Sequence, residues 1–238
     1  EVTVLSDPDQ LTRIWADEKL PPLFIPDEFI TQSGTRIVKS QNSRERVIHR
    51  PVPVTDVVES RYPEPENKDF VQQINIPDAP TLQKNEAGIL LHQIFSGKSP
   101  QTVLAEYGIT SLAAEIYCTS LYEQFCSLPL IQDSSVSYQE LSFVTYIGPY
   151  PVTGRIDRLI QISDGTWAVI DYKSGNYSGA EWQLNFYRKA AERITGQTVR
   201  MFVYSIQTGK MTEAPCLSDE EMIQYLKEWT DSNIQKMV

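Results

Sequence analysis

The sequence has little cysteine, and the spacing of its cysteines suggests no pairing. Three are present among 238 residues, at Cys118, Cys126 and Cys216, with no Cys-x-x-Cys pair and no even set for a disulfide framework. Such usage is typical of a reducing compartment, so a cytoplasmic location is expected.

Long apolar runs and a surplus of basic residues are also lacking. The run that begins at Trp167 falls far short of the roughly 20 residues that a membrane span needs, so no transmembrane helix is expected. Acidic residues outnumber basic ones by 31 to 21, and the net charge of -10 excludes a globally basic surface for nucleic acid. Residues 151–200 carry a small basic excess, 7 against 5, which leaves a local phosphate site open.

Two further signals are absent. No GxxxxGK[ST] loop occurs, so the chain is not expected to bind or hydrolyse ATP. The chain starts at Glu1 with neither a Met nor an apolar leader, so we expect it to be a piece of a longer protein.

Proline is concentrated at one end, with ten of the fifteen prolines in the first 80 residues. Because proline removes a backbone donor and fixes φ, this part is not expected to form a run of regular helices or central strands. Residues 1–82 are therefore predicted to be a partly ordered arm or linker. Its apolar stretches, 23–25 and 54–58, would dock against a core or form edge strands.

The pattern changes from about residue 83, and residues 83–238 are predicted to form one domain. Apolar residues recur at helical spacing near 86–96 and 180–195, and Ser99, Ser111 and Ser218 are placed to begin further helices. β-rich runs separated by turn residues predict a mixed α/β sheet flanked by helices. Its strands are expected near residues 138–146, 152–162, 167–172 and 199–206.

Two acidic residues stand out in two neighbouring predicted strands. A turn centred between Asp164 and Gly165 would set Asp157 opposite Tyr172, beside Asp171. Buried carboxylates are costly unless they are paired or bind a metal, and two of them with a main-chain carbonyl suit Mg²⁺. Lys173 shares a strand face with Asp171, where a lysine can orient a water or neutralise charge on a phosphoryl group.

Four short motifs give the sequence a family resemblance. In chain order they are Gly88-Ile-Leu-Leu-His92, Gly154-Arg-Ile-Asp157, Asp171-Tyr-Lys173 and Gln183-Leu-Asn-Phe-Tyr187. Each is weak alone, but the ordered set resembles the PD-(D/E)xK nuclease superfamily and, within it, the RecB-like branch. The resemblance covers about residues 83–210 and implies a restriction-endonuclease-like core, a mixed sheet flanked by helices.

The resemblance also implies roles for individual residues. Asp157, Asp171, His92 and the main-chain carbonyl of Tyr172 would hold Mg²⁺ or Mn²⁺, and Lys173 would be the catalytic lysine alongside the two acids. Gln183 and Tyr187 would steady the active-site loop or the DNA backbone. Some members of the superfamily hold an iron–sulfur cluster with four cysteines, and the three cysteines here predict none.

Other charged residues have more open interpretations. Glu140 is either an acid that contacts the metal ligands without binding the metal itself, or a surface residue. Arg155 and Arg158 are candidates for phosphate contacts. The helical charges Arg188, Lys189 and Arg193 either contact phosphates or are simply solvated, and His49 is given no role.

The leading hypothesis is a Mg²⁺- or Mn²⁺-dependent deoxyribonuclease, an exonuclease, that acts in DNA end processing and recombinational repair. The missing start suggests the C-terminal domain of a helicase–nuclease of the AddA or RecB kind, so the expected partners are DNA, the parent chain's helicase domain and a partner subunit. The alternative is a catalytically silent domain that binds DNA or docks a subunit. A third reading is a metal hydrolase for small phosphoesters.

Overall fold

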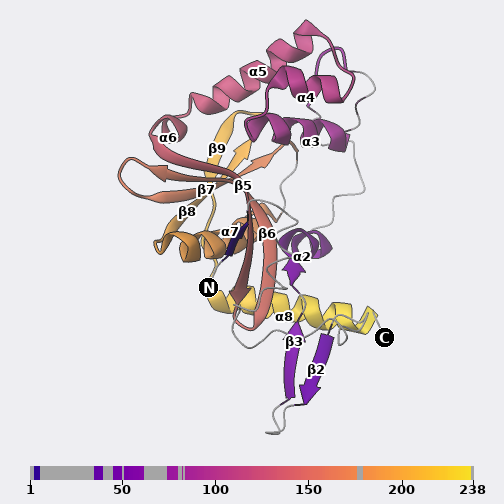
Figure 1. The fold of residues 1–238 in the computed structure, drawn as a ribbon, viewed down its shortest axis with the longest axis vertical. Helices are drawn as coiled ribbons and strands as arrows, with labels where there is room; N and C mark the ends of the chain where they lie inside the picture. The colour runs from indigo at the N-terminus through magenta and orange to yellow at the C-terminus, as the bar shows by residue number, and fades with distance from the viewer. Residues whose placement is uncertain are drawn as a thin grey trace.

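The computed structural model describes residues 3–5, 35–39, 45–49, 51–61, 74–79, 82, 84–175 and 179–236 (Figure 1). Much of the predicted arm, including the stretch 23–25, lies outside these residues. Within them, seven strands form one mixed sheet, and two more, β2 (Thr35–Lys39) and β3 (Glu45–His49), form a separate hairpin.

The centre of the sheet is the meander that the turn residues predicted. β5 (Ser134–Ile147), β6 (Tyr150–Ile162) and β7 (Trp167–Lys173) pair antiparallel in that order. β8 (Val199–Ser205) then runs parallel to β7, because the helix between them returns the chain to the same end of the sheet.

Short strands complete the sheet at its edges. β9 (Lys210–Glu213) pairs antiparallel with β8, β1 (Thr3–Leu5) pairs with β5, and β4 (Val52–Pro53) lies parallel to β6. β9 was not predicted, because its four residues are largely exposed and carry no alternating apolar pattern.

Four helices cover one face of the sheet: α3 (Lys84–Phe95), α4 (Pro100–Glu106), α5 (Leu112–Cys126) and α6 (Pro129–Gln132) (Figure 1). Ser111 caps α5 as predicted, because its hydroxyl accepts from the backbone N–H groups of Ala113 and Ala114. Ser99 precedes Pro100 at the start of α4, but its side chain forms no capping hydrogen bond. Phe95 and Phe125 bury their rings here beneath the helices.

The opposite face is covered by α7 (Ala180–Thr195), α8 (Asp219–Lys236) and α2 (Val54–Arg61). A capping box begins α8, since Ser218 and Glu221 each bond the other's backbone N–H. Leu184 and Leu226 are fully buried in the core between these helices and the sheet.

The core also includes residues on the N-terminal side of the predicted boundary at residue 83. Val52, Val54, Val57 and Val58 are buried in the same cluster as Leu226. The Tyr225 hydroxyl donates to the Val57 carbonyl at 3.0 Å. Of the two alternatives for the stretch 54–58, docking on the core and forming an edge strand, the structure shows the first. The stretch docks as part of helix α2.

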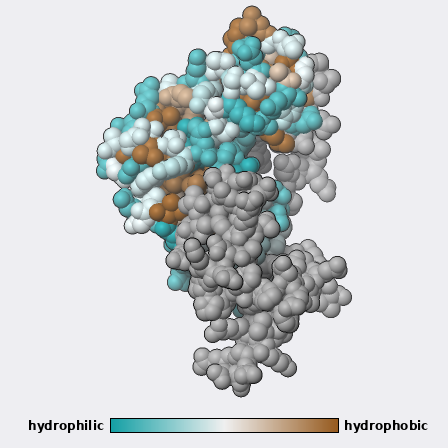
Figure 2. Space-filling model, viewed as in Figure 1, coloured by the Kyte–Doolittle hydropathy of each residue, from teal (hydrophilic) through white to brown (hydrophobic). Residues whose placement is uncertain are grey.

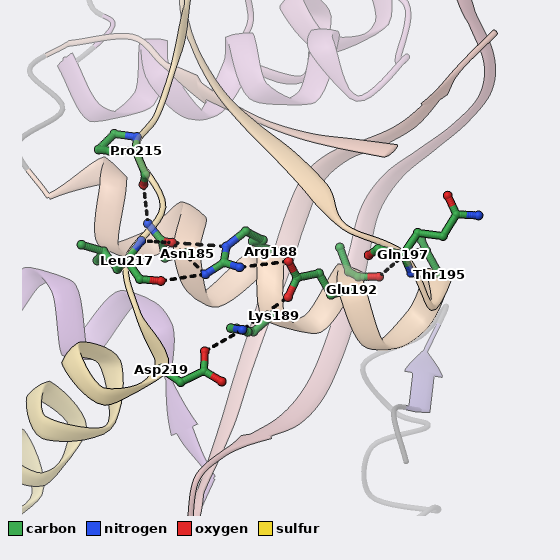
Figure 3. Close-up of polar contacts among 10 residues, drawn as sticks. Asn185, Arg188, Lys189, Glu192, Thr195, Gln197, Pro215, Leu217 and Asp219 are labelled. Carbon is green, nitrogen blue, oxygen red and sulfur yellow. Dashed lines mark hydrogen bonds and ion pairs between the residues drawn. The ribbon is translucent and has the colours of Figure 1, made fainter. Parts of the chain in front are cut away.

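Buried polar side chains of α7 hold the segment that leads into α8 (Figure 3). The Asn185 amide donates to the Pro215 carbonyl at 3.0 Å and accepts from the Leu217 N–H at 2.9 Å, while Arg188 donates to the Leu217 carbonyl at 2.9 Å. Lys189 pairs with Asp219 at 2.6 Å. Arg188 and Lys189 therefore serve the packing of α8 and are not simply solvated.

The surface of the described part is mixed in character. Figure 2 shows small apolar groups among hydrophilic ones. Within the same residues, no helix combines the length and the hydrophobicity that crossing a bilayer requires.

Candidate active site

The hairpin register brings the two acidic residues to the same face of the sheet. Arg158 lies opposite Ile170, and the Ile162 N–H donates to the Thr166 carbonyl. One residue further along each strand, Asp157 lies opposite Asp171. The predicted pairing of Asp157 with Tyr172 is therefore wrong by one residue. The turn is one residue longer than assumed, with Gly165 at φ 90. Because directly opposed residues share a face, this one-residue difference places both carboxylates together.

The two carboxylates are nearly removed from water. The side chain of Asp171 is 1% exposed and that of Asp157 is 12% exposed. One Asp157 oxygen accepts from the Tyr172 N–H at 2.9 Å. Burial, together with the neighbouring Asp171 charge, raises the pKa of Asp157 well above its ordinary value.

Lys173 begins a hydrogen-bonded chain on the same face. Its ammonium lies 2.9 Å from Asp171 Oδ2 and donates to Gln183 Oε1 at 2.8 Å, and the Gln183 amide donates to the Tyr187 hydroxyl at 2.6 Å. Burial opposes the charge of Lys173, but the Asp171 carboxylate, with a smaller contribution from Asp157, raises the pKa of Lys173 overall. The lysine is therefore an ammonium held between an acid and an amide.

His92 approaches from the other side of the sheet, on α3. Its Nδ1 lies 3.6 Å from Asp157 Oδ2, and its side chain is 32% exposed. Burial lowers the pKa of His92 despite the nearby Asp171 charge, so the imidazole is neutral at pH 7 and has a free lone pair.

The donor set suits a hard divalent cation in its chemistry. The buried Asp171 Oδ2 has an ionic partner in Lys173 but no hydrogen bond, and one ammonium faces two carboxylates. Throughout the described ranges, however, no three His, Cys, Asp or Glu side chains are close enough together to share an ion. The two carboxylates are the residues that could hold a metal here, and His92 lies 3.6 Å from one of them.

Two motif glycines make room for the site. A Cβ at Gly154 would lie 2.6 Å from the Phe143 ring and 3.2 Å from the ring of Tyr187. A Cβ at Gly88 would lie 2.8 Å from the hydroxyl of Ser174, the residue after Lys173. Gly154 therefore allows Phe143 and Tyr187 to pack against the sheet, and Gly88 leaves room for the Ser174 hydroxyl.

The structure contradicts the expected phosphate contact of Arg158. This residue is 5% exposed and points into the aromatic layer on the α3 face. It donates to the Tyr172 hydroxyl at 2.5 Å and to the Phe95 carbonyl at 2.8 Å, and it lies 5.1 Å from the centre of the Phe125 ring. It thereby ties the strand of Asp171 to the helix of His92.

Arg158→Met should destabilise the protein. The change leaves the Phe95 carbonyl and the Tyr172 hydroxyl without their donor, at about 1–3 kcal/mol for each buried group. We expect a loss of about 2 kcal/mol and a melting temperature lower by about 4–8 °C, measured by circular dichroism. Arg155→Met, at a side chain 65% exposed, is the control and should stay within about 0.5 kcal/mol of wild type.

Asp157→Asn should alter how stability depends on pH. A carboxyl whose folded pKa is raised contributes stability below its ordinary pKa, and this contribution is lost as pH rises through the folded pKa. Asn removes the charge and keeps an oxygen for the Tyr172 N–H. Without metal, the variant should therefore melt above wild type at pH 7, with the difference shrinking toward pH 4. A difference in melting temperature that stays constant across that range would refute the raised pKa of Asp157.

The remaining candidates lie at separate places. Glu140 and Arg155 form an ion pair of 2.7 Å on strands β5 and β6, near Asp157. Arg193 donates to the hydroxyl of Thr145, which is fully buried. Strand alternation places Arg158 on the opposite face of β6 from Asp157 and Arg155 on the same face, but the buried partners of Arg158 have no signal in the sequence.

The sequence matches the family described as the PD-(D/E)XK nuclease superfamily over residues 70–238. The chain belongs to this nuclease superfamily. The mixed sheet flanked by helices that the resemblance implied is confirmed. No curated protein matches the sequence significantly.

Comparison with solved structures finds weak similarity to several chains. A candidate exonuclease from Eubacterium rectale is 13% identical, with 79% of this chain and 80% of that chain covered and a TM-score of 0.45. The protein SSO0001 is 15% identical, with 80% and 76% covered and a TM-score of 0.34. Protein VC1899 from Vibrio cholerae is 12% identical, with 68% and 47% covered and a TM-score of 0.28.

Proposed function

We propose that this chain is a Mg²⁺- or Mn²⁺-dependent deoxyribonuclease that hydrolyses phosphodiester bonds. The observation that carries the proposal is the convergence of Asp157, Asp171 and Lys173 on one face of the sheet at the end of β7. These are the residues that the superfamily motif would supply, and both acids and the lysine are present.

In this proposal the cation is held by Asp157, Asp171 and the main-chain carbonyl of Tyr172, with His92 contributing least. All but His92 are oxygen donors, which Mg²⁺ and Mn²⁺ prefer, and the neutral imidazole of His92 adds a nitrogen donor. When bound, the cation would polarise the phosphoryl group and lower the pKa of a water.

Lys173 would supply a positive charge beside the reacting phosphoryl group. Its ammonium is charged at neutral pH, so it can orient the attacking water or neutralise charge that develops on the phosphoryl oxygens. Gln183 accepts from this ammonium and Tyr187 supports Gln183, so the motif helix α7 would fix the direction of the lysine side chain.

We further propose membership of the RecB-like branch and exonuclease action in DNA end processing and repair. The four motifs in their order support the branch, since Gly88 and His92 lie on α3 and Gln183 and Tyr187 lie on α7. A net charge of -10 favours a parent chain whose helicase domain, or a partner subunit, supplies most of the grip on DNA.

A nuclease assay tests the proposal. End-labelled linear DNA and circular DNA, single- and double-stranded, are incubated with the protein in Mg²⁺, Mn²⁺ or EDTA. We expect cleavage of linear DNA from its ends with either metal, none in EDTA, and none by the Asp157→Asn/Asp171→Asn variant. DNA binding without cleavage in any metal would favour the silent docking alternative, and hydrolysis of small phosphoesters alone would favour the third reading.

A further inference from the structure

Glu140 has an unusual backbone conformation for a strand residue. It lies within β5 at φ 51, and among the described residues Asp78 is the one other non-glycine residue with positive φ. Its neighbours Gln139 and Leu141 pair with Arg158 and Ile156 of β6, so Glu140 lies across from Asp157. The left-handed region disfavours a residue with a Cβ, and glycine would occupy it without strain.

The side chain at this strained position has a specific partner. Glu140 Oε2 lies 2.7 Å from Nε of Arg155, two residues before Asp157 on β6 and therefore on the same face of the sheet. The Arg155 side chain is 65% exposed, whereas that of Glu140 is 29% exposed. The acid thus anchors the inner end of a guanidinium that remains open to solvent.

The pair also lies beside the two carboxylates. Arg155 is two residues from Asp157 on β6, and Glu140 lies across from Asp157 on β5. Arg155 is therefore placed where a nucleic acid bound at Asp157 and Asp171 would bring its phosphates.

We propose that Arg155 binds a DNA backbone phosphate beside the one that is cleaved, and that Glu140 is the positioning residue that holds the guanidinium there. The proposal rests on the proposed nuclease function and adds how the same site grips its substrate. A guanidinium with Nε engaged by a carboxylate keeps its terminal N–H groups for a phosphate.

The sign of the Glu140 effect separates positioning from plain charge. Removing an acid close to DNA should strengthen binding if Glu140 only repels phosphates. If Glu140 positions Arg155, removing it should weaken binding despite the lost repulsion. Glu140→Gln keeps the side-chain size, and Glu140→Gly also relieves the backbone.

The experiment measures kcat, KM and DNA binding for Arg155→Met, Glu140→Gln, Glu140→Gly and the double variant Arg155→Met/Glu140→Gln. The matched control is the cross-strand pair Arg200–Glu213, which is 2.9 Å apart and half-exposed, on β8 and β9. Binding of fluorescent DNA by anisotropy, in Ca²⁺ and in EDTA, gives a reading that does not depend on cleavage. Calorimetry with Mn²⁺ gives the metal affinity.

For Arg155→Met we expect a KM about 10-fold higher, kcat within about twofold, and a slope of log affinity against log salt reduced by about 1. Glu140→Gln and Glu140→Gly should raise KM about threefold, which is about 0.65 kcal/mol of lost binding. Both should leave Mn²⁺ affinity unchanged, and Glu140→Gly should melt no lower than wild type. The double variant should match Arg155→Met, while Arg200→Met and Glu213→Gln should match wild type.

Three results would overturn the proposal. A lower KM in Glu140→Gln would show that Glu140 only repels DNA phosphates. A weaker Mn²⁺ affinity in the same variant would show that Glu140 is a metal ligand. Normal anisotropy and salt slope in Arg155→Met would remove the phosphate contact. If wild type cuts no DNA in any metal, the nuclease proposal fails, while the anisotropy comparison still decides whether Arg155 contacts DNA.

Discussion

Lys173→Ala is expected to reduce single-turnover DNA cleavage by about 10²-fold or more, some 2.7 kcal/mol in the barrier. The ammonium lies between Asp171 and Gln183, and its charge is needed mainly when the phosphoryl group becomes more negative. DNA and metal affinity should therefore change much less than the rate.

Lys189→Ala is the matched control for this variant. The Lys173 and Lys189 side chains are equally exposed, at 23%, and Lys189 also pairs with an acid, Asp219, at 2.6 Å. Loss of packing and of an ion pair should be similar in both variants, so melting curves should shift alike. A folded Lys173→Ala protein that cleaves at the wild-type rate, or an equal rate loss in Lys189→Ala, would refute the catalytic role.

Asp171→Asn should weaken Mn²⁺ binding by more than about 10²-fold in calorimetry, and cleavage should be lost with it. The change removes one of two charged oxygen donors at a position that is 1% exposed, where water cannot readily replace it. It also leaves the Lys173 ammonium without its acid, so the variant should be less stable than wild type.

Asp164→Asn provides the control for lost acidic charge. Asp164 lies in the turn between β6 and β7 and accepts from the Thr166 N–H, which an asparagine oxygen can replace. We expect wild-type Mn²⁺ affinity from this variant. Unchanged Mn²⁺ affinity in Asp171→Asn would place the metal elsewhere in the chain.

Much of the fold was predictable because its local signals agree with its packing. The β-rich runs of β6 and β7, bounded by turn residues, and the helical spacing of α7 are clear signals, so these element types were confirmed. The hairpin register was wrong by one residue, because Asp-Gly suits several turn lengths and the three-residue loop is set by pairing along the whole strand. β9 was missed because an exposed edge strand needs no apolar alternation.

The candidate site was also predictable only in part from the sequence. Linear motifs grouped Asp157, Asp171, Lys173, Gln183 and Tyr187, and the last three lie in one hydrogen-bonded chain. Strand alternation predicts that Arg155 and Arg158 point to opposite faces of β6, but the partners of Arg158 belong to a buried aromatic layer assembled from four distant segments, α3, α5, β7 and β8. The strained backbone of Glu140 has no signal in the sequence at all.

Single-turnover cleavage of end-labelled DNA, titrated with Mn²⁺, tests the central claim most directly. The account predicts that the rate rises with a midpoint equal to the calorimetric dissociation constant for Mn²⁺, falls to background in EDTA, and stays at background for the Asp157→Asn/Asp171→Asn variant at every Mn²⁺ concentration. Cleavage that persists in EDTA, or wild-type cleavage by that double variant, would contradict a metal-dependent site at these two carboxylates.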